Sequence, residues 1–398
     1  MKGHRLFMDP VYEEFIPIKR GSLLDRVISS RFLQRLRYIR QLGPCYLVYP
    51  GAEHTRFQHS LGVTWLVDKA LYYLELNGFK VESEVKEAVR LSALLHDVGH
   101  SPFSHALEGF ILPQNHEELT VYGIKTLKEE ENLEKEVVEE VVKILKKEHS
   151  LPFTYQLVSS QLDCDRLDYL RRDSFYTGAA FGRIDYNRIL ISGLLENGEL
   201  VWSIKGFNAL EAYVMSRYQM YWAVYFHKGN LSAQVLLQKV VKRVKELLLN
   251  GEELPVNGHL KRTLKEGSKE DFFNLTDGHL ICAIYELKDW KDPILKDLCW
   301  RFVKRKLFRT VEVSPTLLIE LRERVEKLGF NPEYYFEVVE PSKVAYSYYS
   351  PDGKDVIKVK VEGRIEELSS VAPTDAVKAL SRKVSKTYAV VPPEVLEQ

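Results

Sequence analysis

Histidine is concentrated in one segment of this 398-residue chain, and this concentration limits the possible folds more than any other feature of the sequence. Six of the 11 histidines lie within residues 54–116. A buried ionisable side chain is costly unless another group pairs with it, and a structural histidine rarely has histidine neighbours. The fold must therefore gather several imidazoles from this segment around partners that stabilise them.

The dipeptide His96-Asp97 follows an apolar stretch, Val89–Leu95, that has helical character. Gly99 and Pro102 are predicted to end this helix, because neither residue type continues a helix well. A divalent cation would satisfy both side chains of the dipeptide at the end of a buried helix. Nitrogen and oxygen donors suit Mn, Fe, Co, Ni or Zn rather than Ca or a thiolate-binding metal.

Two ligands do not hold a catalytic metal, so the sequence should supply others. His59 leads into a second helical pattern, Leu61–Val67, and Asp165 follows the apolar-flanked run Val158–Leu162. Two neutral imidazoles and two carboxylates would neutralise a dication and leave positions open for water and a phosphate oxygen. A His-Asp dipeptide alone is weak evidence, because a single buried histidine is more often a hydrogen-bonded core residue than a metal ligand.

The composition excludes several classes of protein. Lys+Arg and Asp+Glu both number 56, so a formal net charge of +0 gives no bulk attraction to nucleic acid. No apolar run approaches the roughly 18 residues that a membrane span needs, so no membrane partner is expected. The 4 scattered cysteines form no CxxC motif, which argues against a disulfide framework or a cysteine zinc site and predicts a reducing, cytoplasmic location.

The predicted fold is mainly α with a smaller α+β region at the C-terminus. Helical periodicity occurs throughout residues 1–250, for example in Leu133–Leu145 and Leu231–Leu249. Residues 251–307 are expected to be a helical or linker extension. Their first part, residues 251–275, is rich in Gly, Glu, Lys and Asn, and could be either a flexible linker or an exposed loop.

Residues 308–398 are predicted to form the α+β region. A hairpin with one solvated face is expected around Pro351–Gly353, with Val344–Tyr349 and Val356–Val361 as its strands. The other predicted elements of this region are strands at Phe308–Val313, Tyr334–Val339 and Tyr388–Val391 and helices at Thr316–Leu328 and Asp375–Val384.

Taken together, the motifs resemble those of the HD-domain phosphohydrolases and, among them, the deoxynucleoside triphosphate (dNTP) triphosphohydrolases, which include dGTPase-like enzymes. The resemblance covers about residues 9–240 and implies an HD-type helical bundle over residues 1–250, whereas the α+β region is covered only weakly. The matching segments are Asp9-Pro10, Gln34–Gly43, Tyr49–Ala52, His54–Ser60, His96–His105, Asp163–Asp173, Arg217 and Tyr225–Lys228.

The resemblance implies that the protein hydrolyses dNTPs. In this reaction a water attacks the α-phosphorus, and the products are a deoxynucleoside and inorganic triphosphate. The implied cofactor is one divalent transition metal per active site, with Mg accompanying the nucleotide. The implied metal ligands are His59, His96, Asp97 and Asp165, in agreement with the donor argument.

The resemblance also implies roles in catalysis and substrate binding. His105 is the candidate that protonates the leaving 5′-oxygen, with His100 beside it. Relatives commonly have Asp at the position of Glu108, which lies three residues after His105. The remaining catalytic candidates are His116 and Glu117. The substrate-binding candidates are Gln41, Leu42, Arg56, Asp168, Tyr169, Asp173, Arg217, Tyr225, His227 and Lys228, of which Arg56, Arg217 and Lys228 are expected to bind phosphate and Tyr169, Asp173 and Tyr225 to face the sugar.

The family resemblance also bears on the partners of the protein and on alternative functions. Arg35 and Arg37 match a segment that in some relatives helps bind an activating nucleotide between subunits, and a homo-oligomer is expected. Nucleic acid is not expected as the main partner. Two alternatives remain open. One is an HD-type phosphodiesterase or phosphatase that acts on another nucleotide, and the other is a nucleotide-sensing regulatory module.

Overall fold

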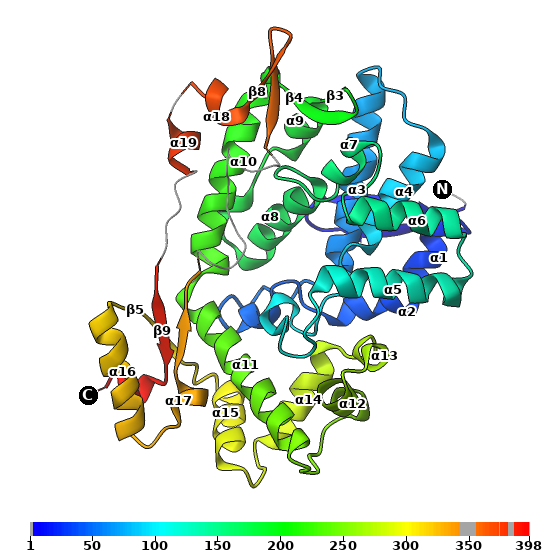
Figure 1. Ribbon diagram of the computed structural model, residues 1–398. Coiled ribbons are helices and arrows are strands. Elements are labelled where there is room, and N and C mark those ends of the chain that lie inside the picture. The colour runs from blue at the N-terminus through cyan, green and yellow to red at the C-terminus, as the bar shows by residue number, and fades with distance from the viewer. Residues whose placement is uncertain (1–2, 342–355, 374, 381–385, 398) are drawn as a thin grey trace.

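The computed structural model defines residues 3–341, 356–373, 375–380 and 386–397. The chain is mainly helical with a C-terminal α+β region, as predicted (Figure 1). No helix among these residues is both long and apolar enough to cross a membrane.

Three helices carry most of the candidate site. They are α3 (Arg56–Leu76), α4 (Ser83–Leu95) and α8 (Cys164–Thr177), and α3 packs against both of the others. The helices that surround them are α1 (Leu23–Ser29), α2 (Arg31–Arg35), α5 (His116–Glu131), α6 (Lys135–Leu145), α7 (Pro152–Gln156), α9 (Tyr186–Ile191) and α10 (Phe207–Met220).

Local sequence sets where the site helices begin. Thr55 and Gln58 form a capping box at the start of α3, which satisfies free backbone N–H groups there. Asp163 caps α8 by accepting a hydrogen bond from the backbone N–H of Arg166 at 2.6 Å. Both helices therefore start just before the residues that were predicted to bind a metal.

The lower part of Figure 1 is built on α11 (Lys228–Leu249). Residues 251–275 form two short helices that pack under it, and Leu260, Leu264 and Phe272 are buried in the same core. This segment is therefore neither a flexible linker nor an exposed loop. The helices of this part are α12 (Gly258–Glu266), α13 (Lys269–Phe272), α14 (Asp277–Leu287) and α15 (Pro293–Val303).

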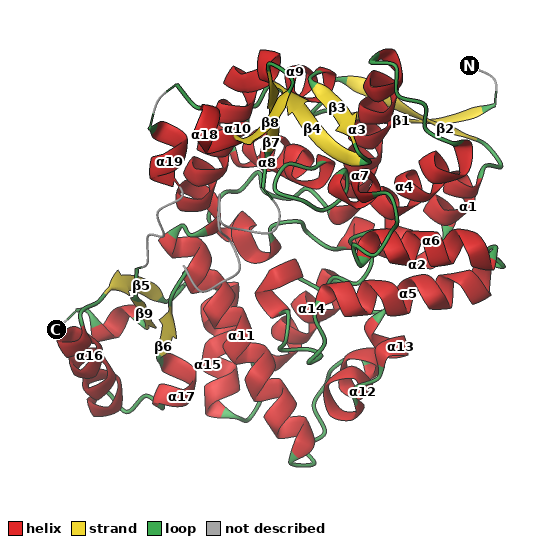
Figure 2. Ribbon diagram, turned by 45° about the horizontal axis from the view of Figure 1, so that its top comes forward, coloured by secondary structure: helices red, strands yellow, loops and turns green. Residues whose placement is uncertain are grey.

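The strands form three small sheets (Figure 2). An N-terminal hairpin pairs β1 (His4–Asp9) with β2 (Glu14–Lys19). A four-stranded sheet has the order β3-β4-β7-β8, and a three-stranded sheet has the order β5-β9-β6. The bounds of these strands are β3 (Gly193–Glu196), β4 (Glu199–Ser203), β5 (Arg309–Glu312), β6 (Glu337–Val339), β7 (Lys358–Val361), β8 (Arg364–Glu367) and β9 (Tyr388–Val391).

The predicted hairpin around Pro351–Gly353 is wrong in its pairing. Strand β7 pairs with β8 across Glu362-Gly363, and both turn residues have positive φ, as a tight two-residue hairpin turn requires. The other predicted partner, Val344–Tyr349, lies outside the described residues. On its second edge β7 runs parallel to β4, with Val359 opposite Trp202.

The C-terminal region is consequently divided between two parts of the molecule. Strands β7 and β8, with α18 (Leu368–Val371) and α19 (Ala376–Leu380), lie at the top of Figure 1 beside α10. Strands β5, β6 and β9, with α16 (Pro315–Lys327) and α17 (Pro332–Tyr335), lie at the lower left.

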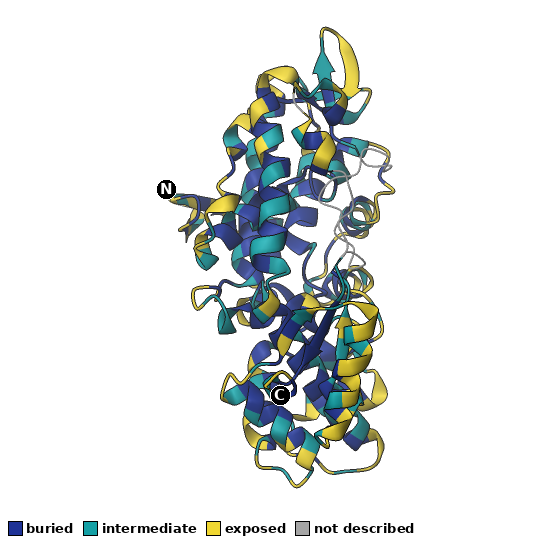
Figure 3. Ribbon diagram, turned by 90° about the vertical axis from the view of Figure 1, so that its left-hand side faces the viewer, coloured by how far each residue is buried: buried dark blue, intermediate teal, exposed yellow. Residues whose placement is uncertain are grey.

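Two hydrophobic cores meet along α3 and α4, and Figure 3 shows buried residues in both the upper and the lower part of the molecule. Helix α3 contributes Phe57 and Leu61 to the core that extends into the lower part, and Val63 and Leu66 to the core of the upper part. Helix α4 is shared between the two cores in the same way. His59 therefore lies near the junction of two packed cores, where its position is well constrained.

Candidate active site

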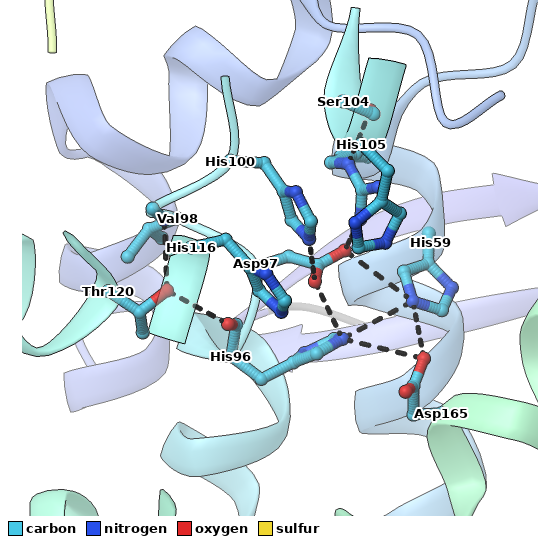
Figure 4. Close-up of polar contacts among 12 residues, drawn as sticks. His59, His96, Asp97, Val98, His100, Ser104, His105, His116, Thr120 and Asp165 are labelled. Carbon is cyan, nitrogen blue, oxygen red and sulfur yellow. Dashed lines mark hydrogen bonds and ion pairs between the residues drawn. The ribbon is translucent and has the colours of Figure 1, made fainter. Parts of the chain in front are cut away.

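The four predicted metal ligands converge on one point (Figure 4). His59 Nε2 lies 3.0 Å from Asp165 Oδ1, 3.3 Å from His96 Nε2 and 3.6 Å from Asp97 Oδ2. Donor atoms held about 2.1 Å from one shared cation are themselves separated by about 3–3.5 Å. The spacing of these side chains fits a divalent metal.

The hydrogen bonds of the two imidazoles support this conclusion. His59 Nδ1 lies 2.7 Å from Asp168 Oδ2, and His96 Nδ1 lies 2.8 Å from the carbonyl oxygen of Ala93. These oxygens accept hydrogen bonds, so in the neutral tautomer each Nδ1 carries the hydrogen and each Nε2 presents a lone pair. A proton or a metal ion shared with the two neighbouring carboxylates would offset the repulsion between lone pairs that face each other at 3.3 Å.

The charges around His59 and His96 also favour a positive charge at this point. Burial lowers the pKa of His59, but hydrogen bonds to Asp165 and Asp168 outweigh that effect and raise its pKa to about 10. Burial also lowers the pKa of His96, and the neighbouring Asp97 and Asp165 carboxylates raise it above the usual value. The carboxylates therefore stabilise positive charge at this point, whether a proton or a metal ion supplies it.

Asp168 was predicted to bind substrate, and the structure shows the contacts that its side chain makes within the protein. Its carboxylate is fully buried and accepts hydrogen bonds from Arg172 Nε at 2.8 Å and Tyr12 Oη at 2.8 Å, in addition to its contact with His59. A Cβ atom at Gly62 would lie 1.9 Å from Asp168 Oδ1, so only glycine fits there. Asp168 therefore fixes the orientation of the His59 ring.

A second cluster of three imidazoles lies next to the metal ligands. The His100 and His116 rings are stacked with their centroids 4.2 Å apart, and the His105 ring meets both of them edge-on. Glu108 holds two members of this cluster, because its carboxylate oxygens lie 2.8 Å from His105 Nδ1 and 2.7 Å from His116 Nδ1. The longer glutamate side chain thus bridges two histidines.

His100 connects the cluster to the metal ligands. Its Nε2 lies 3.2 Å from Asp97 Oδ1, whereas its buried Nδ1 has no hydrogen-bond partner among the residues that the structure describes. The His105 side chain is 46% exposed. Glu117 is exposed on the first turn of α5, and no polar contact joins it to the cluster within the described part of the chain.

The electrostatics of the second cluster are opposite to those of the metal ligands. Burial, the Arg56 guanidinium and His116 lower the pKa of His100 well below its usual value. The pKa of His105 is also lowered, by desolvation and by the neighbouring Arg56 and His116, against a hydrogen bond to Glu108 that raises it. Burial alone would raise the pKa of Glu108, but hydrogen bonds to His105 and His116 lower it, so this carboxylate stays ionised.

Arg56 lies between the two clusters, where the sequence predicted a phosphate-binding cation. Its side chain is buried, and it donates to Asp97 Oδ2 through Nη1 and to Ser104 Oγ at 2.7 Å through Nε. It therefore places a permanent positive charge beside both the metal ligands and the neutral imidazoles.

The predicted sugar-facing residues gather around Asp173. This carboxylate accepts a hydrogen bond from Tyr225 Oη at 2.7 Å and contacts His54 Nε2 at 2.7 Å. Tyr225 belongs to a π-helical turn, Tyr221–Tyr225, a feature that often marks functional sites. The Tyr169 ring packs edge-on against the Tyr225 ring.

Two further residues, Gln41 and Leu42, were predicted to bind substrate. Gln41 is buried, and its Oε1 has no hydrogen-bond partner among the described residues. Its backbone N–H donates to the carbonyl oxygen of His54 at 2.9 Å, so it lies near the Asp173 contact. Leu42 packs against the core of the upper part.

The structure places three predicted substrate-binding residues in other environments. Arg217 is buried on α10 and donates to the carbonyl oxygen of Gln161 at 3.0 Å. His227 caps α11 and accepts from the backbone N–H of Gly229 at 3.1 Å. The exposed Lys228 directs its Nζ towards the Tyr388 ring, 5.7 Å from the ring centroid. These contacts do not bring His227 or Lys228 to the metal ligands.

The two arginines that match an activator-binding segment differ from each other. Arg35 is buried and donates to the carbonyl oxygens of Leu275, Val98 and His100, so it is not available to a nucleotide on the surface. Arg37 is exposed, with its guanidinium 3.6 Å from the Phe57 ring centroid.

Sequence reasoning assigned no role to several residues that support the site. Arg172 links Asp168 to Asp9 at the end of the N-terminal hairpin, and Tyr12 follows that hairpin strand. His54 stacks on Tyr176 with centroids 4.6 Å apart while it contacts Asp173. His54, Asp9 and Arg172 all belong to the matched motifs, so the sequence pointed to these residues without indicating what they do.

Comparison with known proteins identifies the class. Residues 56–173 match the HD domain, and residues 184–320 match the HD associated region. The chain is 35% identical over 387 residues to the YwfO protein of Bacillus subtilis, covering 93% of this chain and 88% of that protein. It is therefore a member of the HD-domain phosphohydrolase family, as the resemblance implied.

Two further relatives bear on the reaction. A phosphohydrolase from Bacteroides thetaiotaomicron has the same fold, with a TM-score of 0.88, 32% identity, and coverage of 98% of this chain and 99% of that chain. The human deoxynucleoside triphosphate triphosphohydrolase SAMHD1 is 29% identical over 377 residues, which cover 81% of this chain and 58% of that protein.

Proposed function

We propose that this protein hydrolyses dNTPs to a deoxynucleoside and inorganic triphosphate. The observation that carries the proposal is the 3.2 Å contact between His100 and Asp97, because it joins a donor set suited to a dication with a cluster of three imidazoles. Similarity to deoxynucleoside triphosphate triphosphohydrolases from Homo sapiens and Bos taurus supports the choice of substrate.

The proposed cofactor is one divalent transition metal, which is Mn, Fe, Co, Ni or Zn, held by His59, His96, Asp97 and Asp165. Bound there, the cation would act as a Lewis acid for a phosphoryl oxygen and a water. Mg would accompany the triphosphate. Arg56 would stabilise negative charge as it develops on the phosphoryl oxygens.

The imidazole cluster would handle the protons. As the water oxygen bonds to the α-phosphorus, the bond from phosphorus to the 5′-oxygen breaks and that oxygen takes a proton from His105 Nε2. Glu108 holds His105 Nδ1 and so fixes the orientation of the ring, with Nε2 as the nitrogen that would donate the proton. The Nδ1 of His100, which has no hydrogen-bond partner among the described residues, is suited to take the proton that the attacking water loses.

Asp173 and Tyr225 would bind the sugar. Asp165 and Asp173 are eight residues apart on α8, which places their Cα atoms about 12 Å apart. A metal-bound α-phosphate and a sugar 3′-hydroxyl fit along this helix, with the 3′-hydroxyl donating to Asp173. The Tyr225 hydroxyl already bonded to that carboxylate would crowd a 2′-hydroxyl.

A nucleotide panel tests the proposal. The metal-analysed protein is incubated with each dNTP, with NTPs, with nucleoside monophosphates and with cyclic nucleotides, and the products are separated by anion exchange. Triphosphate from dNTPs supports it. Orthophosphate from a monophosphate, or a ring-opened cyclic nucleotide, would instead identify another HD-type phosphatase or phosphodiesterase. Binding without turnover would favour a nucleotide-sensing module.

A homo-oligomer and an activating nucleotide are part of the same proposal. Arg37 is the exposed candidate for contact with an activator, whereas Arg35 serves the fold. Activity with mixtures of dNTPs, compared with single dNTPs, would reveal activation, and light scattering would give the oligomeric state.

A further inference from the structure

Two consecutive residues between His100 and His105 have a backbone conformation that side chains disfavour. Phe103 has φ +58° and Ser104 has φ +57°, and neither residue is glycine. A non-glycine residue in the left-handed region costs on the order of 1–3 kcal/mol and persists only where surrounding contacts fix it. The turn that leads into His105 is therefore held in place by other parts of the protein.

The side chains that hold this turn come from several segments. The Phe103 ring is fully buried, and Gly43 lies so close that a Cβ there would be 2.5 Å from the Phe103 carbonyl oxygen. Ser104 Oγ donates to the carbonyl oxygen of Arg40 at 2.6 Å and accepts from Arg56. The remaining polar group, the backbone N–H of Phe103, donates to Asp277 Oδ1 at 2.7 Å.

Asp277 lies on the first turn of α14, beyond the matched HD domain and 174 residues from Phe103. It is buried, and its second oxygen accepts from the backbone N–H of Arg40 at 3.0 Å. Burial raises its pKa to about 6, against hydrogen bonds that lower it. A single carboxylate therefore bridges the turn and the segment that contains Arg40.

We propose that Asp277 is a positioning residue for the imidazole cluster. By accepting the Phe103 N–H, it stabilises the left-handed turn and so fixes His105 relative to the metal ligands. Arg35 reinforces the same link, because it joins the carbonyl oxygen of Leu275 to that of His100. The HD associated region thus completes the active site. The effect on turnover rests on the proposed function.

The test compares Asp277→Ala with Thr276→Ala. The control removes the residue that caps the same helix end but has no bond to Phe103. Asp277→Ala should lower kcat by about 10²-fold, since a misplacement of about 1 Å can cost that much, while KM changes less than about threefold and metal content stays full. Hydrogen exchange in peptides covering residues 100–108 should become faster. Thr276→Ala should leave kcat and this exchange unchanged.

Either a kcat within about twofold of the control, or unchanged exchange in residues 100–108, overturns the proposal. Asp277→Asn covers the case in which the alanine variant does not fold. The asparagine side chain has one acceptor oxygen, which serves only one of the backbone N–H groups of Phe103 and Arg40. Wild-type kcat together with wild-type exchange in this variant would therefore also overturn the proposal. Exchange and metal content need no substrate, so they remain informative if dNTPs are not hydrolysed. The kcat comparison then uses whichever nucleotide the wild-type protein cleaves.

Discussion

The metal-ligand set and the imidazole cluster use the same side chain in opposite electrostatic environments. At the metal ligands, carboxylates raise the pKa values of His59 and His96. In the imidazole cluster, burial and Arg56 lower the pKa values of His100 and His105. The first environment favours a cation, and the second favours neutral rings that can receive an anion. Neighbouring charges, not residue type, therefore divide the chemistry between the two clusters.

Loss of a metal ligand should have the largest effect. His96→Ala and Asp97→Ala should lose bound metal and lower turnover by at least about 10³-fold, because Lewis-acid stabilisation contributes several kcal/mol. Elemental analysis and single-substrate kinetics measure both. His259→Ala, at a partly exposed histidine paired with Asp271, serves as the control and should retain metal. Full metal content in the His96 or Asp97 variants would show that the ligand assignment is wrong.

Substitution of His105 should lower turnover without loss of metal, and so distinguish the roles of the two clusters. His105→Ala should keep its metal and lose turnover by about 10²-fold or more, since general acid catalysis contributes that much. The measurement is metal content together with kcat on the same preparation. Unchanged turnover would remove His105 from the acid role, and loss of metal would show that the clusters are not independent.

The contact between Asp168 and His59 should tune metal affinity. Asp168→Asn keeps the shape of the side chain but weakens the acceptor for His59 Nδ1, so metal affinity should fall by about 10–100-fold. Competition with a chelator gives the affinity. If this variant binds metal as tightly as the wild-type protein but has a raised KM for nucleotide, then the original prediction of a substrate contact was better.

The sugar contact should have a smaller effect. Tyr225→Phe removes the hydroxyl that donates to Asp173, and a hydrogen bond to a charged group contributes about 1.5–3 kcal/mol. The ratio of kcat/KM for a dNTP to that for the matching NTP should fall by about tenfold. Competition between the two nucleotides measures this ratio directly, and an unchanged ratio would refute the sugar assignment.

The pH dependence should show the smallest change. If His105 acts as an acid, kcat/KM falls as pH rises through its lowered pKa, and kcat falls at a higher pH because bound triphosphate stabilises the protonated ring. Glu108→Gln removes a carboxylate that raises this pKa. The pH at which kcat/KM falls and the pH at which kcat falls should therefore both become lower, although His100, His116 and Arg56 still face the ring. Identical profiles for the two proteins would contradict the account.

The grouping of the four proposed metal ligands was predictable because each residue follows or begins a helical pattern and has a suitable donor type. The role of Asp168 was not, because Asp165 and Asp168 lie close together on the same helix. Which carboxylate faces the ion depends on how α8 packs against α3 at Gly62. Lys228 follows a π-helical turn, which helical periodicity does not reveal.

The fold was predictable to a similar degree. Amphipathic patterns located α6 and α11, whereas the partner of β7 depends on contact with a strand 150 residues away, which a local pattern does not encode. The left-handed Phe103-Ser104 turn has no glycine to indicate it. Features that depend on long-range contacts, such as Asp277, become visible only in the folded chain.

Hydrolysis in ¹⁸O-labelled water tests the central claim most directly. The protein is incubated with a dNTP in this water, the products are separated, and their masses are measured by mass spectrometry. The account predicts one labelled oxygen in inorganic triphosphate and none in the deoxynucleoside, because the water oxygen joins the α-phosphorus and the 5′-oxygen leaves with a proton from His105. Label in the deoxynucleoside, or release of orthophosphate without triphosphate, would contradict it.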